Sequence, residues 1–198
     1  MKKLFLVFMI ISSGLVCLLI SCNEQKTSGT EQVTADSAKT FTAEQAARGA
    51  YLVQIMGCSD CHTPLKMGAN GPEPDMEHYL SGYPSGLTMP PLDTAAAKKW
   101  ILMSYTSSAF TGPWGTSFAA NLTSDETGIG NWNLGQFKKA MKEGKWKGMD
   151  GNRTLLPPMP WQNFKNIKDA DIRDIFAYLK STKPINNAEP AWQPPVGM

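Results

Sequence analysis

The first residues of the chain divide into an apolar run and a polar segment. Lys2 and Lys3 precede seventeen mostly apolar residues from Leu4 to Ile20. That run is shorter than the roughly 20 residues that a membrane-spanning helix needs. A basic start followed by a short apolar run is typical of an export signal. Residues 1–21 are therefore predicted to be a signal peptide that takes no part in the fold.

The segment 22–40 is polar. After Cys22 it contains a single large apolar side chain, Val33, which buries too little to offset the entropy lost on ordering the chain. The pattern predicts a flexible tether with a root-mean-square reach on the order of 25 Å.

Helical patterns begin after the tether. The first predicted helix starts at Thr42, with Gln45 in the position of a capping-box partner, and runs to about Met56. Another starts at Asn133 and ends at Gly144, a residue type that favours helix ends.

The last predicted helix has the clearest pattern. Acidic residues favour its start and basic residues its end, and Pro184 stops it. Its apolar stripe has helical spacing and consists of Ile172, Ile175, Phe176 and Leu179.

Loops are expected to fill much of the remaining chain. Residues 63–92 are rich in proline and glycine, so regular structure should be sparse there. A short helix is predicted from Asp93 to about Met103, and no run of alternating residues indicates strands. The prediction is an all-α domain over residues 41–190 with long loops, followed by a C-terminal tail at 191–198. Such long loops need something to pack against.

Composition and charge exclude some classes of protein. The chain has 198 residues, of which 42% are hydrophobic and 18% charged, and a formal net charge of +2. Loss of Lys2 and Lys3 with the signal peptide would leave equal numbers of acidic and basic side chains. A nucleic-acid partner is not expected, because that would require a strongly basic face.

The four cysteines have different predicted fates. Cys17 leaves with the signal peptide, and Cys22 ends a run, Leu19-Ile20-Ser21-Cys22, that resembles the lipobox of bacterial lipoproteins. An ordinary signal peptide or an uncleaved anchor is the alternative. With Cys22 as the lipidation site, the mature domain keeps only Cys58 and Cys61.

These two cysteines begin the most informative motif, Cys58-Ser59-Asp60-Cys61-His62. It is the attachment pattern for a c-type haem. Two thiols three residues apart can add to the two vinyl groups of one porphyrin, and the adjoining His62 imidazole then becomes the proximal iron ligand. The motif predicts one covalently attached haem c.

Three other uses of the motif are weaker. A thioredoxin-like site needs a βαβ pattern, which the sequence lacks. A zinc site needs four ligands, and beyond the motif the mature domain adds only His78 and acidic residues, with no second cysteine pair. A disulfide that closes so short a loop would contribute little stability.

The sixth iron ligand has several candidates. Met159 stands among prolines that stiffen its loop and can aim a thioether. Met89, which precedes two prolines, competes on the same reasoning, although methionine is more often a core residue than a ligand. His78 would give a bis-histidine iron, but its surroundings favour an exposed loop.

Over roughly residues 42–190 the chain resembles class I cytochromes c, in particular the haem domains in cytochrome subunits of bacterial membrane-associated dehydrogenases. The matching stretches are Arg48-Gly49-Ala50-Tyr51-Leu52-Val53, the motif 58–62 with Thr63-Pro64, Asn121-Leu122-Thr123, Thr127-Gly128-Ile129-Gly130-Asn131-Trp132, Leu156-Pro157-Pro158-Met159-Pro160-Trp161 and Ile175-Phe176-Ala177-Tyr178-Leu179-Lys180.

The resemblance implies that Met159 is the sixth ligand. It also implies that the first and last helices cross at a small residue, with Gly49 meeting Tyr178 or its neighbours. The chain departs from the family in its single haem motif, in the long segment 66–115, and in Lys168 at the start of the last helix, where a capping Ser or Thr is usual.

The leading functional hypothesis is a one-electron carrier in a respiratory or dehydrogenase-linked chain, without catalytic residues of its own. Its partners would be a dehydrogenase, an oxidase or another cytochrome. One alternative is a haem enzyme or gas sensor with a labile sixth ligand. Another is an electron-entry subunit of a larger oxidoreductase, for which a lysine-rich stretch at 138–147 suggests an acidic partner, unless it is simply a solvated helix face.

The expected location is outside the cytoplasm. The lipid on Cys22 would anchor the protein to a bacterial membrane, facing the periplasm. Asn23 is not the aspartate that retains lipoproteins at the inner membrane in the best-known sorting rule, which favours the outer membrane.

Overall fold

The computed structural model describes residues 41–195. The predicted signal peptide, the Cys22 lipidation site and the tether all lie outside these residues, as do residues 196–198. Within the described range, no helix is both long and apolar enough to cross a membrane.

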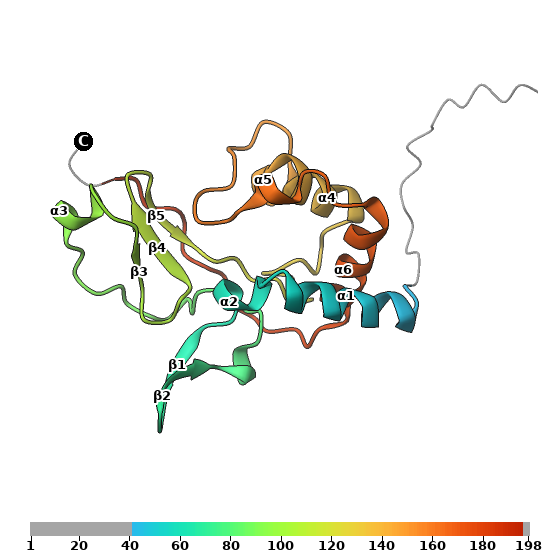
Figure 1. Ribbon diagram of the computed structural model, residues 1–198, viewed down its shortest axis with the longest axis horizontal. Helices are drawn as coiled ribbons and strands as arrows, with labels where there is room; N and C mark the ends of the chain where they lie inside the picture. Colours follow the sequence, from blue (N-terminus) through green and yellow to red (C-terminus); the bar gives the residue numbers. More distant parts are fainter. Residues whose placement is uncertain (1–40, 196–198) are drawn as a thin grey trace, which may run out of the picture. The chain divides into compact units, whose positions relative to one another are not determined.

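The described elements follow one another from the first helix to the last as Figure 1 shows. The α-helices are α1 (Ala43–Ile55), α2 (Cys58–His62), α3 (Thr94–Ala97), α4 (Leu134–Glu143), α5 (Trp161–Phe164) and α6 (Asp169–Ser181). The strands are β1 (Leu65–Gly68), β2 (Gly71–Pro74), β3 (Leu102–Met103), β4 (Ala109–Gly112) and β5 (Gly115–Phe118). Two 3₁₀ turns are η1 (Met76–His78) and η2 (Trp146–Gly148).

The capping predictions for the long helices are confirmed. Thr42 and Gln45 form a reciprocal capping box at the start of α1, and Asn133 does the same for α4. Gly144 ends α4 with a φ of 65°, a left-handed conformation that glycine adopts without steric cost. Lys168 precedes α6 without a side-chain capping bond.

Helices α1 and α6 pack against each other at Gly49. A Cβ built on Gly49 would overlap the backbone carbonyl oxygen of Asp174 and lie 2.8 Å from the Tyr178 Cβ. Only a residue without a side chain therefore allows this approach. The crossing expected from the family resemblance is present, and it involves Tyr178.

The hydrophobic core joins these helices to α4 and to two loops. In α4, Phe137 lies with its ring centroid 5.3 Å from that of Phe176 in α6. Burying each large apolar side chain contributes on the order of 2 kcal/mol. The buried cluster consists of Leu52, Val53, Leu80, Ile129, Phe137, Met141, Ile172, Ile175, Phe176 and Leu179.

The prediction of an all-α domain is confirmed only in part, because the structure contains strands as well as helices. Helix accounts for about 35% and strand for about 14% of the structure. β1 and β2 form one antiparallel sheet, and β3, β4 and β5 form another in that order. The strands of the described residues lie within 65–118, and each has four residues or fewer. Strands that short leave no alternating pattern for sequence analysis to detect.

The helix predicted from Asp93 to about Met103 is also mostly wrong. Asp93 caps α3, but the helix ends at Ala97, and Leu102–Met103 instead form the edge strand β3. Hydrogen bonding to β4 decides the conformation there, overriding the apolar pattern of the segment.

Replacing Gly49 with alanine tests the helix crossing. The added methyl group would push α1 from α6, and overpacking of this kind costs about 1–3 kcal/mol. We therefore expect Gly49→Ala to lower the free energy of unfolding in chemical denaturation. Gly135→Ala in α4 is the control, because its Cβ would first meet the movable Asn133 Oδ1 at 3.2 Å. Equal stability of the two variants would contradict the close packing at Gly49.

Candidate haem site

The two motif cysteines lie on one short helix. Met56 caps the end of α1, and Gly57, with a φ of 68°, turns the chain into α2. Because Cys58 and Cys61 are three residues apart on α2, their side chains share one face. Both are free thiols and partly exposed.

The environment keeps both thiols protonated. Burial raises the pKa of Cys58 to about 11, and the negative charge of Asp60 adds to this effect. The pKa of Cys61 is also raised, first by burial and then by Asp60. A disulfide oxidoreductase needs the opposite, a thiol whose pKa is lowered. The site therefore does not favour the thioredoxin-like alternative.

The imidazole of His62 is held by a hydrogen bond. Its Nδ1 lies 2.7 Å from the backbone carbonyl oxygen of Ala120. Since a carbonyl only accepts, Nδ1 carries the proton and Nε2 carries a lone pair. Burial lowers the His62 pKa, which favours this neutral form. Within residues 41–195, no hydrogen bond engages Nε2, so this atom is free to bind a metal.

No local sequence signal indicates that Ala120 takes part in the site. It lies just before the Asn121-Leu122-Thr123 stretch, which carries part of the family resemblance. Its contribution is a backbone carbonyl, which any residue type can supply. The sequence therefore indicated the neighbouring stretch 121–123, but it could not identify Ala120 itself.

Met159 and Met89 have different surroundings. Met159 is partly buried and packs against the hydrophobic core cluster, as Cys58 does. Met89 is also partly buried but is not among the residues that pack on this cluster. The loop that carries Met159 is also bonded to β5, because the Ser117 hydroxyl donates to the Pro157 carbonyl at 2.7 Å. Of these two methionines, only Met159 packs on the core cluster that Cys58 also contacts.

His78 lies in an exposed turn. Its Nδ1 pairs with the Asp75 Oδ2 at 2.6 Å, within η1 and its cap. Across the described residues, no group of three or more His, Cys, Asp or Glu side chains is placed to hold a metal ion. The zinc alternative therefore finds no ligand set in the described residues.

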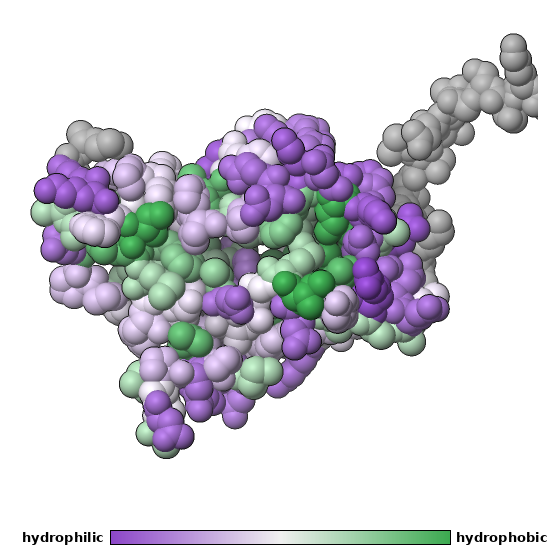
Figure 2. All heavy atoms as spheres, in the orientation of Figure 1, coloured by the Kyte–Doolittle hydropathy of each residue, from purple (hydrophilic) through white to green (hydrophobic). Residues whose placement is uncertain are grey.

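The surface between α2 and the Met159 loop suits a large apolar group. Figure 2 shows this face hollowed between hydrophobic residues, in the part of the view where Figure 1 places α2 below and the loop before α5 above. Among the partly buried hydrophobic residues that pack against the core cluster are Leu122, Trp132, Leu134, Phe164 and Ile167. The thiol pair, the free Nε2 and these apolar side chains fit a haem.

Most of the described chain matches a known protein family. The model of the family described as "Cytochrome c" matches residues 46–183. The chain belongs to the cytochrome c family. Haem c is accordingly the cofactor that the family implies.

Several curated proteins are similar to this cytochrome c domain. One nicotinate dehydrogenase subunit of Pseudomonas putida is 44% identical over 162 residues, covering 81% of this chain and 10% of the relative. The fructose dehydrogenase cytochrome subunit of Gluconobacter japonicus is 29% identical, covering 75% of this chain and 24% of the relative. The cytochrome c subunit of a quinone-dependent alcohol dehydrogenase from Gluconobacter oxydans is also 29% identical, with 79% and 26% covered. The chain thus spans about a quarter or less of the length of these relatives.

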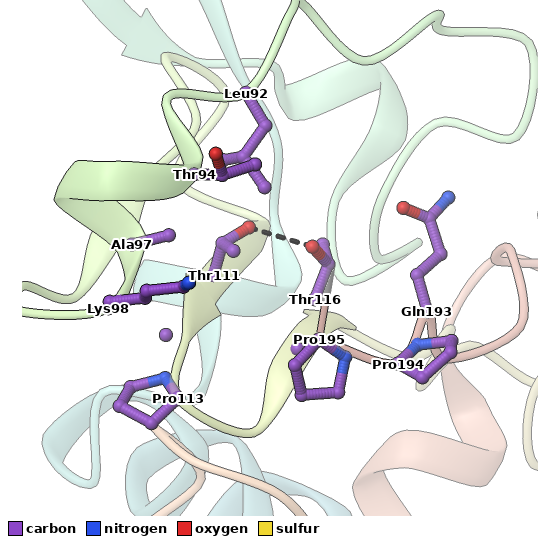
Figure 3. Close-up of a pocket in the computed structure, with 12 residues that line it drawn as sticks. Leu92, Thr94, Ala97, Lys98, Thr111, Pro113, Thr116, Gln193, Pro194 and Pro195 are labelled. Carbon is purple, nitrogen blue, oxygen red and sulfur yellow. Dashed lines mark hydrogen bonds between the residues drawn. The ribbon is translucent and has the colours of Figure 1, made fainter. Parts of the chain in front are cut away.

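A separate pocket of about 370 Å³ lies beyond the candidate haem site. Residues 92–98, 111–116 and 193–195 contribute to its walls, as Figure 3 shows. The hydroxyls of Thr111 and Thr116 bond to each other across 2.8 Å at its base. None of the predicted site residues lines it.

The lysine-rich stretch has partners within the chain. Lys138 and Lys142 of α4 both pair with Asp169 of α6, at 2.5 and 2.9 Å. Hydrogen bonds from these lysines lower the Asp169 pKa to about 2. Lys139 pairs with Asp150 at 2.7 Å. These lysines therefore join α4 to its neighbours, which weakens the argument that they dock an acidic partner.

Proposed function

We propose that this cytochrome c family member carries single electrons on one haem c bound covalently to Cys58 and Cys61. The observation that supports it most is the His62 imidazole, whose Nδ1 is held by the Ala120 carbonyl while Nε2 stays free. A hydrogen bond of this type orients a metal-binding histidine and increases its basicity. In this proposal His62 is the proximal iron ligand.

The residues around the site would bind and shield the group. Haem iron cycles between Fe(II) and Fe(III) and so accepts or donates one electron at a time. The Cys58 and Cys61 side chains would prevent dissociation of the haem, and the apolar residues between α2 and the Met159 loop would exclude water from it. This function requires no bond to a substrate, so no catalytic residue is proposed in this chain.

Met159 is proposed as the sixth ligand. Its packing on the same core cluster as Cys58 supports this assignment over Met89. With His62 and Met159 both as ligands, the thioether would raise the reduction potential and would fill the last position on the iron. Such a centre suits electron transfer better than the enzyme or sensor alternative.

The partners are proposed to be other redox proteins. Three of the similar proteins are named as cytochrome subunits of dehydrogenases, and another is a dehydrogenase subunit. We infer that this chain exchanges electrons with a dehydrogenase or with the oxidase or cytochrome that follows it. These names also favour the second candidate function, an electron-entry subunit held within a larger oxidoreductase.

The location is proposed from the sequence alone. The run ending at Cys22 supports cleavage after residue 21 and a lipid on the new N-terminus. The lipid would tether the domain to a bacterial membrane, facing the periplasm, with the outer membrane favoured.

Mass spectrometry tests the cofactor. The exported protein should carry the mass of one haem, retained under denaturing conditions because thioether bonds survive unfolding. The double variant Cys58→Ala with Cys61→Ala should lose that mass, while Cys17→Ala, in the predicted signal peptide, should not. A wild-type mass equal to that of the polypeptide would contradict the cytochrome function.

Spectroscopy tests the sixth ligand. The oxidised protein should show the weak long-wavelength band of a thioether-bound ferric haem. Met159→Ala should remove this band, lower the reduction potential and open the iron to carbon monoxide. Met89→Ala is the matched control and should change none of these. The reverse result would move the assignment to Met89, and carbon monoxide binding by the wild type would favour the sensor or enzyme function.

Fractionation tests the anchor. Cys22→Ser should release the protein from the membrane fraction and leave the haem spectrum unchanged, because the lipidation site lies outside the haem domain. Cys17→Ser, which precedes the predicted cleavage site, is the control. If the Cys22 variant still sediments with membranes, the anchor lies elsewhere.

A further inference from the structure

The chain after α6, residues 182–195, runs back toward the part of the structure that contains His62 and Ala120. Figure 1 shows it in dark red, running from α6 to β5, where the backbones of Gln193 and Thr116 exchange two hydrogen bonds. On this path the segment places Asn187 in the interior, only 8% exposed. Asn187 lies beyond residues 46–183, which the cytochrome c family model matches.

The Asn187 side chain directs its hydrogen bonds at one loop. Its Nδ2 donates to the carbonyls of Ser81 and Tyr83, at 2.7 and 2.8 Å. Its Oδ1 accepts from the Ser85 backbone N–H at 2.9 Å. One buried side-chain amide, more than a hundred residues away in the chain, therefore bonds to three backbone groups of loop 81–85.

This loop presses on the peptide that binds His62. The Tyr83 N–H donates to the Ala119 carbonyl at 2.9 Å, and the Gly82 N–H donates to the His62 carbonyl at 2.8 Å. A Cβ on Gly82 would lie 2.6 and 2.7 Å from the carbonyl carbon and oxygen of Ala120. The carbonyl that accepts from His62 Nδ1 thus rests directly on this loop.

The same segment also holds the other side of Ala120. Asn121, only 2% exposed, donates through Nδ2 to the Ile185 carbonyl at 2.8 Å. Its backbone N–H points to the Glu189 Oε2 at 3.4 Å. Residues 185–189 therefore restrain both loop 81–85, which contacts the Ala120 carbonyl, and Asn121, which follows Ala120.

We propose that Asn187 is a positioning residue for His62, acting through loop 81–85 and the Ala120 carbonyl. The inference rests on the proposed function in that it makes Asn187 a determinant of the reduction potential. A strong Nδ1–H bond increases the basicity of the imidazole and favours the oxidised iron. Loosening the Ala120 carbonyl weakens that bond and shifts the potential upward.

The direct test is hydrogen exchange at His62 Nδ1, followed by NMR in the full-length, haem-loaded and reduced protein. Asn187→Ala removes three side-chain hydrogen bonds, two that Asn187 donates to loop 81–85 and one that it accepts from that loop. We expect exchange of the Nδ1 proton to accelerate about tenfold or more, the effect of losing a net hydrogen bond or two. The reduction potential should rise in the same variant.

Asn152→Ala is the matched control. Asn152 is partly buried, and like Asn187 it donates through Nδ2 to a backbone carbonyl, that of Trp146 at 2.9 Å. Among the described residues it makes no hydrogen bond to 81–85 or 119–122. It should change neither the exchange rate nor the potential. Asn187→Ser, which keeps one donor, should give an intermediate exchange rate and serves if the alanine variant does not fold.

The outcomes separate the inference from the proposed function. A lower melting temperature for Asn187→Ala with unchanged Nδ1 exchange and potential would overturn the inference, because the residue would then only stabilise the fold. A wild type without covalent haem would overturn the proposed function. The positioning role would still be decided by comparing Nδ1 exchange in the haem-free wild type and variant.

Discussion

The hydrogen bond between His62 and the Ala120 carbonyl requires two distant parts of the chain to meet with little freedom. It sets the tautomer of the imidazole and therefore which nitrogen is available to a metal. The ring is fixed from one side by α2, which follows α1 after a single left-handed glycine. The carbonyl is fixed from the other side by irregular backbone. The helices thus hold the donor of this hydrogen bond, His62, and the loops hold its acceptor, the Ala120 carbonyl.

The core explains why the helices can do this. α1 and α6 approach closely at Gly49, and their apolar faces continue into α4 through Phe137 and Phe176. Cys58 and Met159 both pack on that cluster, although they are about a hundred residues apart. One hydrophobic cluster therefore contacts both a haem-motif cysteine and the methionine proposed as the sixth ligand. The ion pairs of Asp169 with α4 strengthen the same arrangement at the surface.

Local sequence signals predicted the three long helices and the attachment motif but not their surroundings. The caps at Thr42 and Asn133 depend on residues three positions apart, so the sequence shows them directly. The strands of 65–118 depend on pairing between short segments, and β3 formed where a helix was expected. Ala120 acts through its backbone carbonyl, which every residue type has, so the sequence could not single it out. The strand content and the histidine's partner were therefore beyond local analysis.

The segment after α6 also has a kinetic consequence. Asn187 meets Ser81 across 106 residues, whereas the caps of α1 and α4 span only three. Closing a long loop costs more entropy than forming a helix turn, and proteins with many such distant contacts fold more slowly. We expect α1 and α2 to form early, while the orientation of the His62 ring is fixed late. Until the His62 ring is fixed, the Cys58 and Cys61 thiols of α2 would stay accessible for the proposed attachment of haem.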